Sequence, residues 1–235
     1  MRFNKNSNIY IIIYIIVLVV VTGAALAFTS VSLKDRQNEN IATDKMRQIL
    51  ASIRISVPDD SVTEVFSKTI TSQFIVNATG EQVAGEAFDV DVAAQVSLPV
   101  DERQLPVYVA TLSPGVVKYI LPVYGAGLWG PIWGYVSLDA DRSTIYGAYF
   151  AHQGETPGLG AEITKPQFTD QFESKTLLHN GAFTPIQVLK KGQKPEAGAD
   201  FVDAVSGGTI TSRGVASMLD NSLAPYTYFL THPEN

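Results

Sequence analysis

The chain has 235 residues, a length that accommodates one membrane segment and a single globular domain. Its formal net charge is -6 and its Lys and Arg residues are scattered, which excludes the concentrated positive charge of a nucleic-acid-binding surface. It has no cysteine, so disulfides, thiolate nucleophiles and iron–sulfur ligation are excluded, and its three histidines lack metal-site spacing. Any redox chemistry therefore requires a bound organic cofactor.

The first predicted element is a membrane-spanning helix. No charged residue occurs from Ile9 to Phe28, and about 20 apolar residues span the roughly 30 Å hydrocarbon core of a bilayer. Arg2 and Lys5 precede this segment, which predicts a cytoplasmic N-terminus and a domain on the outer, periplasmic side of the bacterial inner membrane. The alternative is a cleaved signal peptide, because Ala25-Leu26-Ala27 has the small-residue pattern of a cleavage site.

A helix continues beyond the membrane segment in this interpretation, because apolar residues recur at helical spacing between Ile41 and Ile53. Pro58 follows this run and ends it. Residues 66–100 alternate short apolar runs with turn markers, which predicts short strands and turns.

The following region is rich in predicted strands, separated by short Gly- and Pro-containing turns that are typical of an antiparallel sheet. The predicted strands are 107–112, 116–123, 132–138, 145–151 and 186–189. A helix start is predicted at 168–172 and a final amphipathic helix at 215–223. We therefore expect an α+β fold with a mainly antiparallel sheet and flanking helices. Its expected parts are 1–34 (N-terminal tip and transmembrane helix), 35–100 (membrane-proximal helix and small α/β region) and 101–235 (cofactor domain).

Three segments contain residues suited to binding a ligand. In the first, Asp203 to Ser212, two glycines allow backbone N–H groups to approach a ligand, and Thr211 or Ser212 is expected to cap a helix whose N-terminus favours an anion. This pattern predicts a phosphate site. An ordinary glycine-containing turn followed by a capped helix is the alternative interpretation.

The second segment, Gly154 to Gly160, follows a predicted strand. Its glycines flank Leu159, and such a loop can lie against a planar ring with the leucine packed on the ring face. A hairpin loop in which Pro157 presets the backbone dihedral is the alternative.

The third segment, Gly125 to Pro131, formally matches the dinucleotide fingerprint G-x-G-x-x-G. That fingerprint requires a helix after the glycines, whereas a strand is predicted here, so a Rossmann fold is rejected. Trp129 and Trp133 lie in glycine-rich surroundings where a ligand has room to approach, although core or edge positions are the ordinary alternative. The nucleophile-elbow and P-loop motifs are absent, which argues against a hydrolase or nucleoside triphosphatase.

In sequence, order and separation, the three segments together resemble the FMN-binding domain of the NqrC family. Members of this family are subunits of the sodium-translocating NADH:quinone oxidoreductase. The resemblance rests on residues 127–135, 155–160 and 203–212, and the N-terminal helix extends it over essentially the whole chain. The homologous subunit of the Rnf-type ferredoxin:NAD oxidoreductase complex shares the threonine motif and is the nearest alternative. A secreted non-redox binding protein is an alternative of another class; it would be colourless, whereas a flavoprotein is yellow.

The resemblance implies covalently bound FMN. In the family, the motif D-x-x-S-G-A-T ends in a threonine esterified to the FMN phosphate. It maps onto Asp203, Ser206, Gly207, Gly208 and Thr209, which makes Thr209 the expected attachment residue. Gly208 stands where alanine is usual in the family. Since a threonine hydroxyl is a weak nucleophile, a separate magnesium-dependent flavin transferase is expected to carry out the attachment.

The resemblance also places the flavin ring near the second segment, with Leu159 as the best candidate for packing on it. The other candidate cofactor contacts are Glu155, Thr156, Gly158, Gly160, Leu128, Trp129, Thr211 and Lys191, and for Lys191 a solvated surface lysine is the ordinary alternative. No catalytic residue and no metal site are expected. The implied function is electron transfer within a membrane respiratory complex whose other subunits bind NADH, quinone and sodium, without independent activity of this chain.

Overall fold

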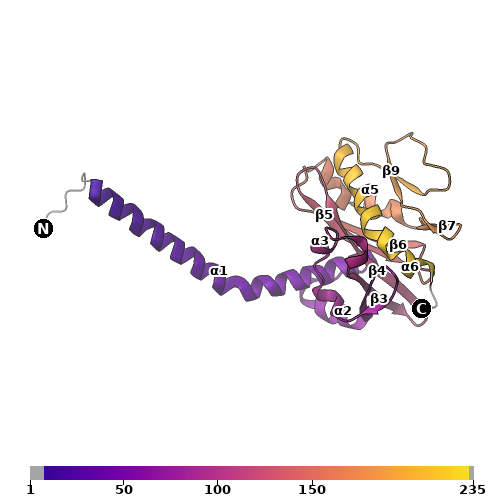
Figure 1. The fold of residues 1–235 in the computed structure, drawn as a ribbon, viewed down its shortest axis with the longest axis horizontal. Helices are drawn as coiled ribbons and strands as arrows, with labels where there is room; N and C mark the ends of the chain where they lie inside the picture. The colour runs from indigo at the N-terminus through magenta and orange to yellow at the C-terminus, as the bar shows by residue number, and fades with distance from the viewer. Residues whose placement is uncertain (1–7, 233–235) are drawn as a thin grey trace. The chain divides into compact units, whose positions relative to one another are not determined.

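The computed structural model describes residues 8–232, and the chain divides into two units between Lys45 and Met46. The first unit consists of most of helix α1 (Asn8–Ser52), which is drawn in indigo and purple in Figure 1. Its apolar side chains are exposed, and the helix is long and apolar enough to cross a membrane. A helix that is apolar all round and exposed requires a nonpolar environment. Arg2 and Lys5, on which the predicted orientation depends, lie outside the described residues.

The second unit is built on a six-stranded antiparallel sheet with strand order β2-β1-β3-β4-β5-β6. Its strands are β1 (Ile70–Val76), β2 (Gln82–Val83), β3 (Leu105–Ser113), β4 (Val116–Ala126), β5 (Pro131–Leu138) and β6 (Ile145–His152). The four strands predicted between residues 107 and 151 are confirmed, and so is the α+β fold. The structure also shows that β1, which lies within 35–100, pairs with β3 in the same sheet that contains the later strands.

Smaller elements complete the second unit. The helices are α2 (Val62–Thr69), α3 (Val92–Gln95), α4 (Pro166–Thr169), α5 (Thr209–Leu223) and α6 (Thr227–Thr231). Two small sheets are formed by β7 (Leu178–His179) with β8 (Ala182–Phe183), and by β9 (Gln187–Leu189) with β10 (Phe201–Asp203). Short 3-10 helices lie at Asp59–Ser61, Ala87–Asp89, Val100–Glu102, Gly160–Thr164, Asp170–Phe172 and Ala224–Tyr226.

Both faces of the sheet are covered, which explains why the central strands are mainly apolar. On one face, α5, drawn in yellow in Figure 1, packs against β4. Gly125 permits this close packing, because a side chain there would meet the Cβ atom of Met218 at 2.7 Å. On the other face, the C-terminal end of α1 and helix α2 form a second apolar cluster that includes Ile49, Leu50 and Phe66.

Two hydrogen bonds fix the end of α1 on the sheet. The indole Nε1 of Trp133 donates to Oε1 of Gln48 at 3.0 Å, and the hydroxyl of Ser137 donates to the carbonyl oxygen of Ser52 at 2.6 Å. Trp133 therefore has a structural role on β5. The end of α1 from Met46 onward is part of the folded domain, whatever environment surrounds the apolar part of the helix.

The expectation for the last helix was wrong in three respects. Helix α5 begins at Thr209, six residues before the predicted start, and α6 follows it. The N-cap of α5 is Gly208, so neither Thr211 nor Ser212 caps this helix. The predicted start followed the apolar residues of the buried face, whereas the first turn is polar and β-branched, a composition with weak helix propensity. Residues 66–100 likewise contain helical turns besides the predicted strands.

The exposure of two isoleucines on α1 yields a matched stability test. Ile49 is 0% exposed and Ile41 is 66% exposed. We expect Ile49→Ala to lower the free energy of unfolding of the detergent-solubilised chain by about 2–5 kcal/mol, because it leaves a cavity in the core. Ile41→Ala should change it by less than about 0.5 kcal/mol. Thermal unfolding followed by tryptophan fluorescence measures both, and equal effects would contradict the packing described for α1.

Candidate functional site

A cavity of about 380 Å³ lies where the three ligand-binding segments of the sequence meet. Its volume is within the range of small-molecule sites. Its walls come from the β4–β5 hairpin loop, the loop after β6 and the start of α5. The lining residues are Leu128, Trp129, Glu155, Thr156, Leu159, Gly160, Gly207, Gly208, Thr209, Ile210 and Thr211.

The carboxylate of Glu155 joins these three walls. Its Oε1 accepts a hydrogen bond from the backbone N–H of Trp129 at 2.8 Å, and its Oε2 accepts one from the hydroxyl of Thr211 at 2.5 Å. Glu155 is only 4% exposed. A Cβ atom at Gly127 or Gly160 would collide with one of its two carboxylate oxygens. The two glycines therefore leave the space that the carboxylate occupies.

A second contact closes the cavity between the loop after β6 and the start of α5. Gly207 has a φ of 75°, a conformation that L side chains rarely adopt, and a Cβ atom there would lie 2.6 Å from Cδ2 of Leu159. Leu159 packs against this bare backbone and remains 43% exposed. Its side chain thus presents an apolar surface at the cavity.

The N-terminus of α5 gives the cavity a site suited to an anion. Thr209 is the first residue of this 15-residue helix, and the N-cap Gly208 makes no side-chain capping bond. The first turn contains no acidic residue. Unpaired N–H groups and the helix dipole favour a negative group at such an end. Thr209 lines the cavity at the same place.

Most of the predicted site residues line this cavity, and four do not. Asp203 lies in β10, where its backbone N–H donates to Oε1 of Gln171, and it lines a separate shallow pocket. Ser206, Gly158 and Lys191 are exposed and lie outside the cavity lining. Conversely, Ile210 lines the cavity and is 55% exposed, although it was not predicted. The sequence signal that could have identified Ile210 as a cavity residue is its position between two threonines of the motif at the start of a helix.

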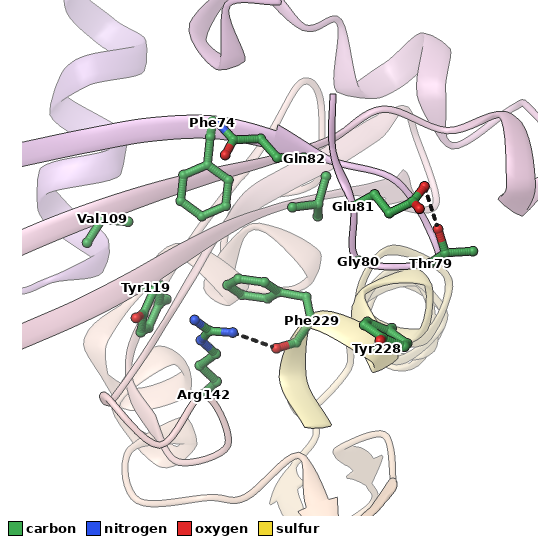
Figure 2. A pocket seen from close by; sticks show the side chains of 11 residues that line it. Phe74, Thr79, Gly80, Glu81, Gln82, Val109, Tyr119, Arg142, Tyr228 and Phe229 are labelled. Carbon is green, nitrogen blue, oxygen red and sulfur yellow. Dashed lines mark hydrogen bonds between the residues drawn. The ribbon is translucent and has the colours of Figure 1, made fainter. Parts of the chain in front are cut away.

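A larger cavity of about 540 Å³, shown in Figure 2, lies between β1, β4 and the C-terminal helix α6. Its buried cation is Arg142, which is 6% exposed. The guanidinium lies over the rings of Phe229 and Tyr119 at 4.2 and 4.8 Å from their centroids, and it donates to the carbonyl oxygens of Phe229 and His232. These contacts fasten α6 to the domain. We call it the structural cavity, because the contacts of Arg142 attach α6 to the domain, and none of the predicted site residues line it.

Comparison with known proteins identifies the family of this chain. Residues 127–224 match the family model described as FMN-binding domain, a range that includes all three cavity walls. The chain is 32% identical over 207 residues to the NqrC subunit of the Na(+)-translocating NADH-quinone reductase of Vibrio vulnificus, covering 81% of each chain. It is also 32% identical to the corresponding protein of Pseudomonas aeruginosa, covering 83% of each. The chain belongs to this NqrC family.

Solved structures of family members have the same fold. The crystal structure of the NqrC protein from Parabacteroides distasonis is 49% identical, covers 85% of this chain and 97% of its own, and superposes with a TM-score of 0.80. The structure of Shewanella oneidensis NqrC is 25% identical, covers 83% and 99%, and gives a TM-score of 0.69.

The residues of the cavity fit FMN. Leu128, Trp129, Leu159 and Ile210 give it apolar walls for a flavin ring, and the N-terminus of α5 suits a phosphate. No group of three His, Asp or Glu side chains that could hold a metal ion occurs between residues 8 and 232.

Proposed function

We propose that this chain is the FMN-carrying electron-transfer subunit of a Na(+)-translocating NADH-quinone reductase, and that its FMN is esterified through the phosphate to Thr209. The observation that carries the proposal is the position of Thr209, which lines an apolar cavity at the uncapped N-terminus of α5 within a matched FMN-binding domain. FMN, when bound, supplies one-electron redox chemistry, and the chain supplies its attachment, orientation and electrostatic environment.

The surrounding contacts favour Thr209 over the neighbouring hydroxyl groups. The hydroxyl of Thr211 donates to Glu155, and that residue is 1% exposed. Ser212 is also 1% exposed, and its hydroxyl accepts the backbone N–H of Val205. Ser206 is exposed but lies outside the cavity lining. Thr209 alone among these four residues lines the cavity without a hydrogen bond from its hydroxyl to another described residue.

The structure also suggests a physical reason for glycine, instead of alanine, at position 208. A Cβ atom at this position would lie 3.1 Å from Cγ1 of Val205 and 3.3 Å from the backbone nitrogen of Gly160. Alanine, which is usual in the family motif, would therefore be tightly packed here. Glycine relieves this packing and keeps the backbone at the helix start close to the loop after β6.

We further propose that attachment requires the magnesium-dependent flavin transferase. Among the described residues, Glu155 is the only one that lines the cavity and has a titratable side chain. The hydrogen-bonded partners of its carboxylate are Trp129 and Thr211, so no general base among the cavity-lining residues is in contact with the hydroxyl of Thr209. The other subunits of the complex are then the electron partners of this chain. The relatives found by comparison are NADH-quinone reductase subunits by name, which favours this assignment over the homologous Rnf-type subunit.

The proposed attachment makes a prediction about Thr209. Thr209→Val should abolish the mass increase of one FMN less water in protein coproduced with the flavin transferase, because valine keeps the shape but removes the hydroxyl. Thr209→Ser should keep the adduct, and so should Ser206→Ala, which removes an exposed hydroxyl outside the cavity. Intact-mass measurement and in-gel flavin fluorescence provide the readouts. An adduct on the Thr209→Val variant would exclude this residue as the attachment site.

A second prediction concerns Leu159. Leu159→Ala should retain the covalent adduct but alter the flavin absorption spectrum and midpoint potential, because the side chain lies on the cavity wall and not at the attachment point. Losing an apolar contact of this size costs on the order of 1–3 kcal/mol. Tyr228→Ala, at an exposed position in the wall of the structural cavity, serves as a control that should leave the spectrum unchanged. An unaltered spectrum and potential in Leu159→Ala would show that this loop does not contact the flavin ring.

A third prediction tests the proposed orientation, with the N-terminus in the cytoplasm and the domain in the periplasm. Because the chain has no cysteine, single cysteines report location without background. In intact spheroplasts, a membrane-impermeant maleimide should label Lys194→Cys, in an exposed loop of the domain, but not Ser7→Cys. The reverse pattern would contradict the orientation. A soluble product beginning at Phe28 would instead identify the N-terminal segment as a cleaved signal peptide.

A further inference from the structure

We propose that Glu155 is a positioning residue with two effects: its buried carboxylate holds the walls of the flavin cavity together, and its negative charge lowers the midpoint potential of the flavin. This inference rests on the proposed function, since it assumes FMN in the cavity. It assigns Glu155 a different role from the direct polar contact to the flavin that its sequence position suggested.

The first effect, which we call bracing, is that the carboxylate of Glu155 holds together the segments that form the cavity walls. Trp129 lies in the β4–β5 hairpin loop and Thr211 in the first turn of α5, and each donates to a different oxygen of the carboxylate. The backbone N–H of Glu155 in turn donates to Nδ1 of His152, the last residue of β6, at 3.2 Å. One residue thus links three segments that are distant in sequence. Trp129 is 68% exposed, so its side chain adds little packing that would hold its own position.

The electrostatic effect follows from the lack of a positive partner. Among the ion pairs that the described residues form, none includes Glu155, and the two groups that donate to its carboxylate are neutral. A carboxylate that is 4% exposed is weakly screened by solvent and salt. Reduction adds an electron to the flavin. A nearby weakly screened anion opposes this addition, so the potential falls.

The hydrogen-bond geometry itself does not require a charge. In Glu155→Gln, the amide oxygen can still accept from the N–H of Trp129, and the amide nitrogen can donate to the hydroxyl oxygen of Thr211. This substitution therefore removes the charge while it keeps both links. Glu155→Ala removes the charge and the links together. The two variants separate the electrostatic effect from the bracing effect.

The electrostatic test uses the full-length flavin-bearing protein in detergent. Spectroelectrochemical titration should give a higher midpoint potential for Glu155→Gln than for the protein without substitutions. For a one-electron step, a shift of about 59 mV corresponds to a tenfold change in the ratio of reduced to oxidised flavin. The matched control is Glu162→Gln. Glu162 accepts the N–H of Gly158 in the same loop, but it is partly exposed and lies outside the cavity lining, so its substitution should shift the potential less.

The bracing test needs no flavin. In the Thr209→Val chain with Trp133→Phe, Trp129 is the single tryptophan, and its fluorescence anisotropy reports the mobility of the hairpin loop. Glu155→Ala should lower this anisotropy, whereas Glu155→Gln should preserve it. An anisotropy that is unchanged in Glu155→Ala would overturn the bracing role. Should the alanine variant fail to fold, Glu155→Asp, whose shorter side chain cannot reach both donors at their present positions, replaces it in the same measurement.

The outcomes distinguish this inference from the proposed function. If the chain without substitutions acquires no flavin on Thr209, the proposed function fails. The anisotropy measurement still decides the bracing role. The electrostatic role is overturned if flavin is attached but Glu155→Gln has the same midpoint potential as the flavin-bearing protein without substitutions. It is also overturned if Glu155→Gln shifts the potential no more than Glu162→Gln does. In both cases the proposed function stands.

Discussion

The proposed flavin cavity depends on the close approach of backbone to the buried carboxylate of Glu155. Gly127 and Gly160 lie on either side of this group, and any side chain at either position would collide with it. A buried carboxylate is costly unless its oxygens accept hydrogen bonds, and here a backbone N–H and a hydroxyl satisfy them. The glycines of two separate motifs are thus required by one side chain.

The sheet provides a rigid support for these loops. Strands β4, β5 and β6 pair over nearly their whole length, and the cavity loops begin where the pairing ends. On the opposite face, the end of α1 is fixed by the bond between Trp133 and Gln48. Trp133 and Trp129 therefore have different roles although they lie four residues apart. One anchors the sheet to α1, whereas the other extends from the hairpin loop at the cavity.

The sequence predicted β3 to β6 well, because these strands are mainly apolar and short turns of polar, Gly or Pro residues separate them. The rejection of a Rossmann fold is also confirmed. Gly125 lies in β4, Gly127 and Gly130 lie in the hairpin loop after it, and the strand β5 follows, not a helix. The start of α5 could not be predicted from apolar spacing, since its first turn contacts the cavity and not the core. The role of Glu155 was also not predictable, because its partners Trp129 and Thr211 lie 26 and 56 residues away.

Local structure also explains how the proposed attachment would select one hydroxyl among several in a short motif. The motif region contains Ser206, Thr209, Thr211 and Ser212, which are chemically similar nucleophiles. Burial and hydrogen bonding occupy the last two, and Ser206 lies outside the cavity lining. Only Thr209 combines access to the cavity with a position at the helix N-terminus that favours the phosphate of the product. A modifying enzyme that recognises the folded domain would therefore need no further discrimination within the motif. The contacts with Glu155 and Val205 keep Thr211 and Ser212 buried, and Ser206 lies away from the cavity.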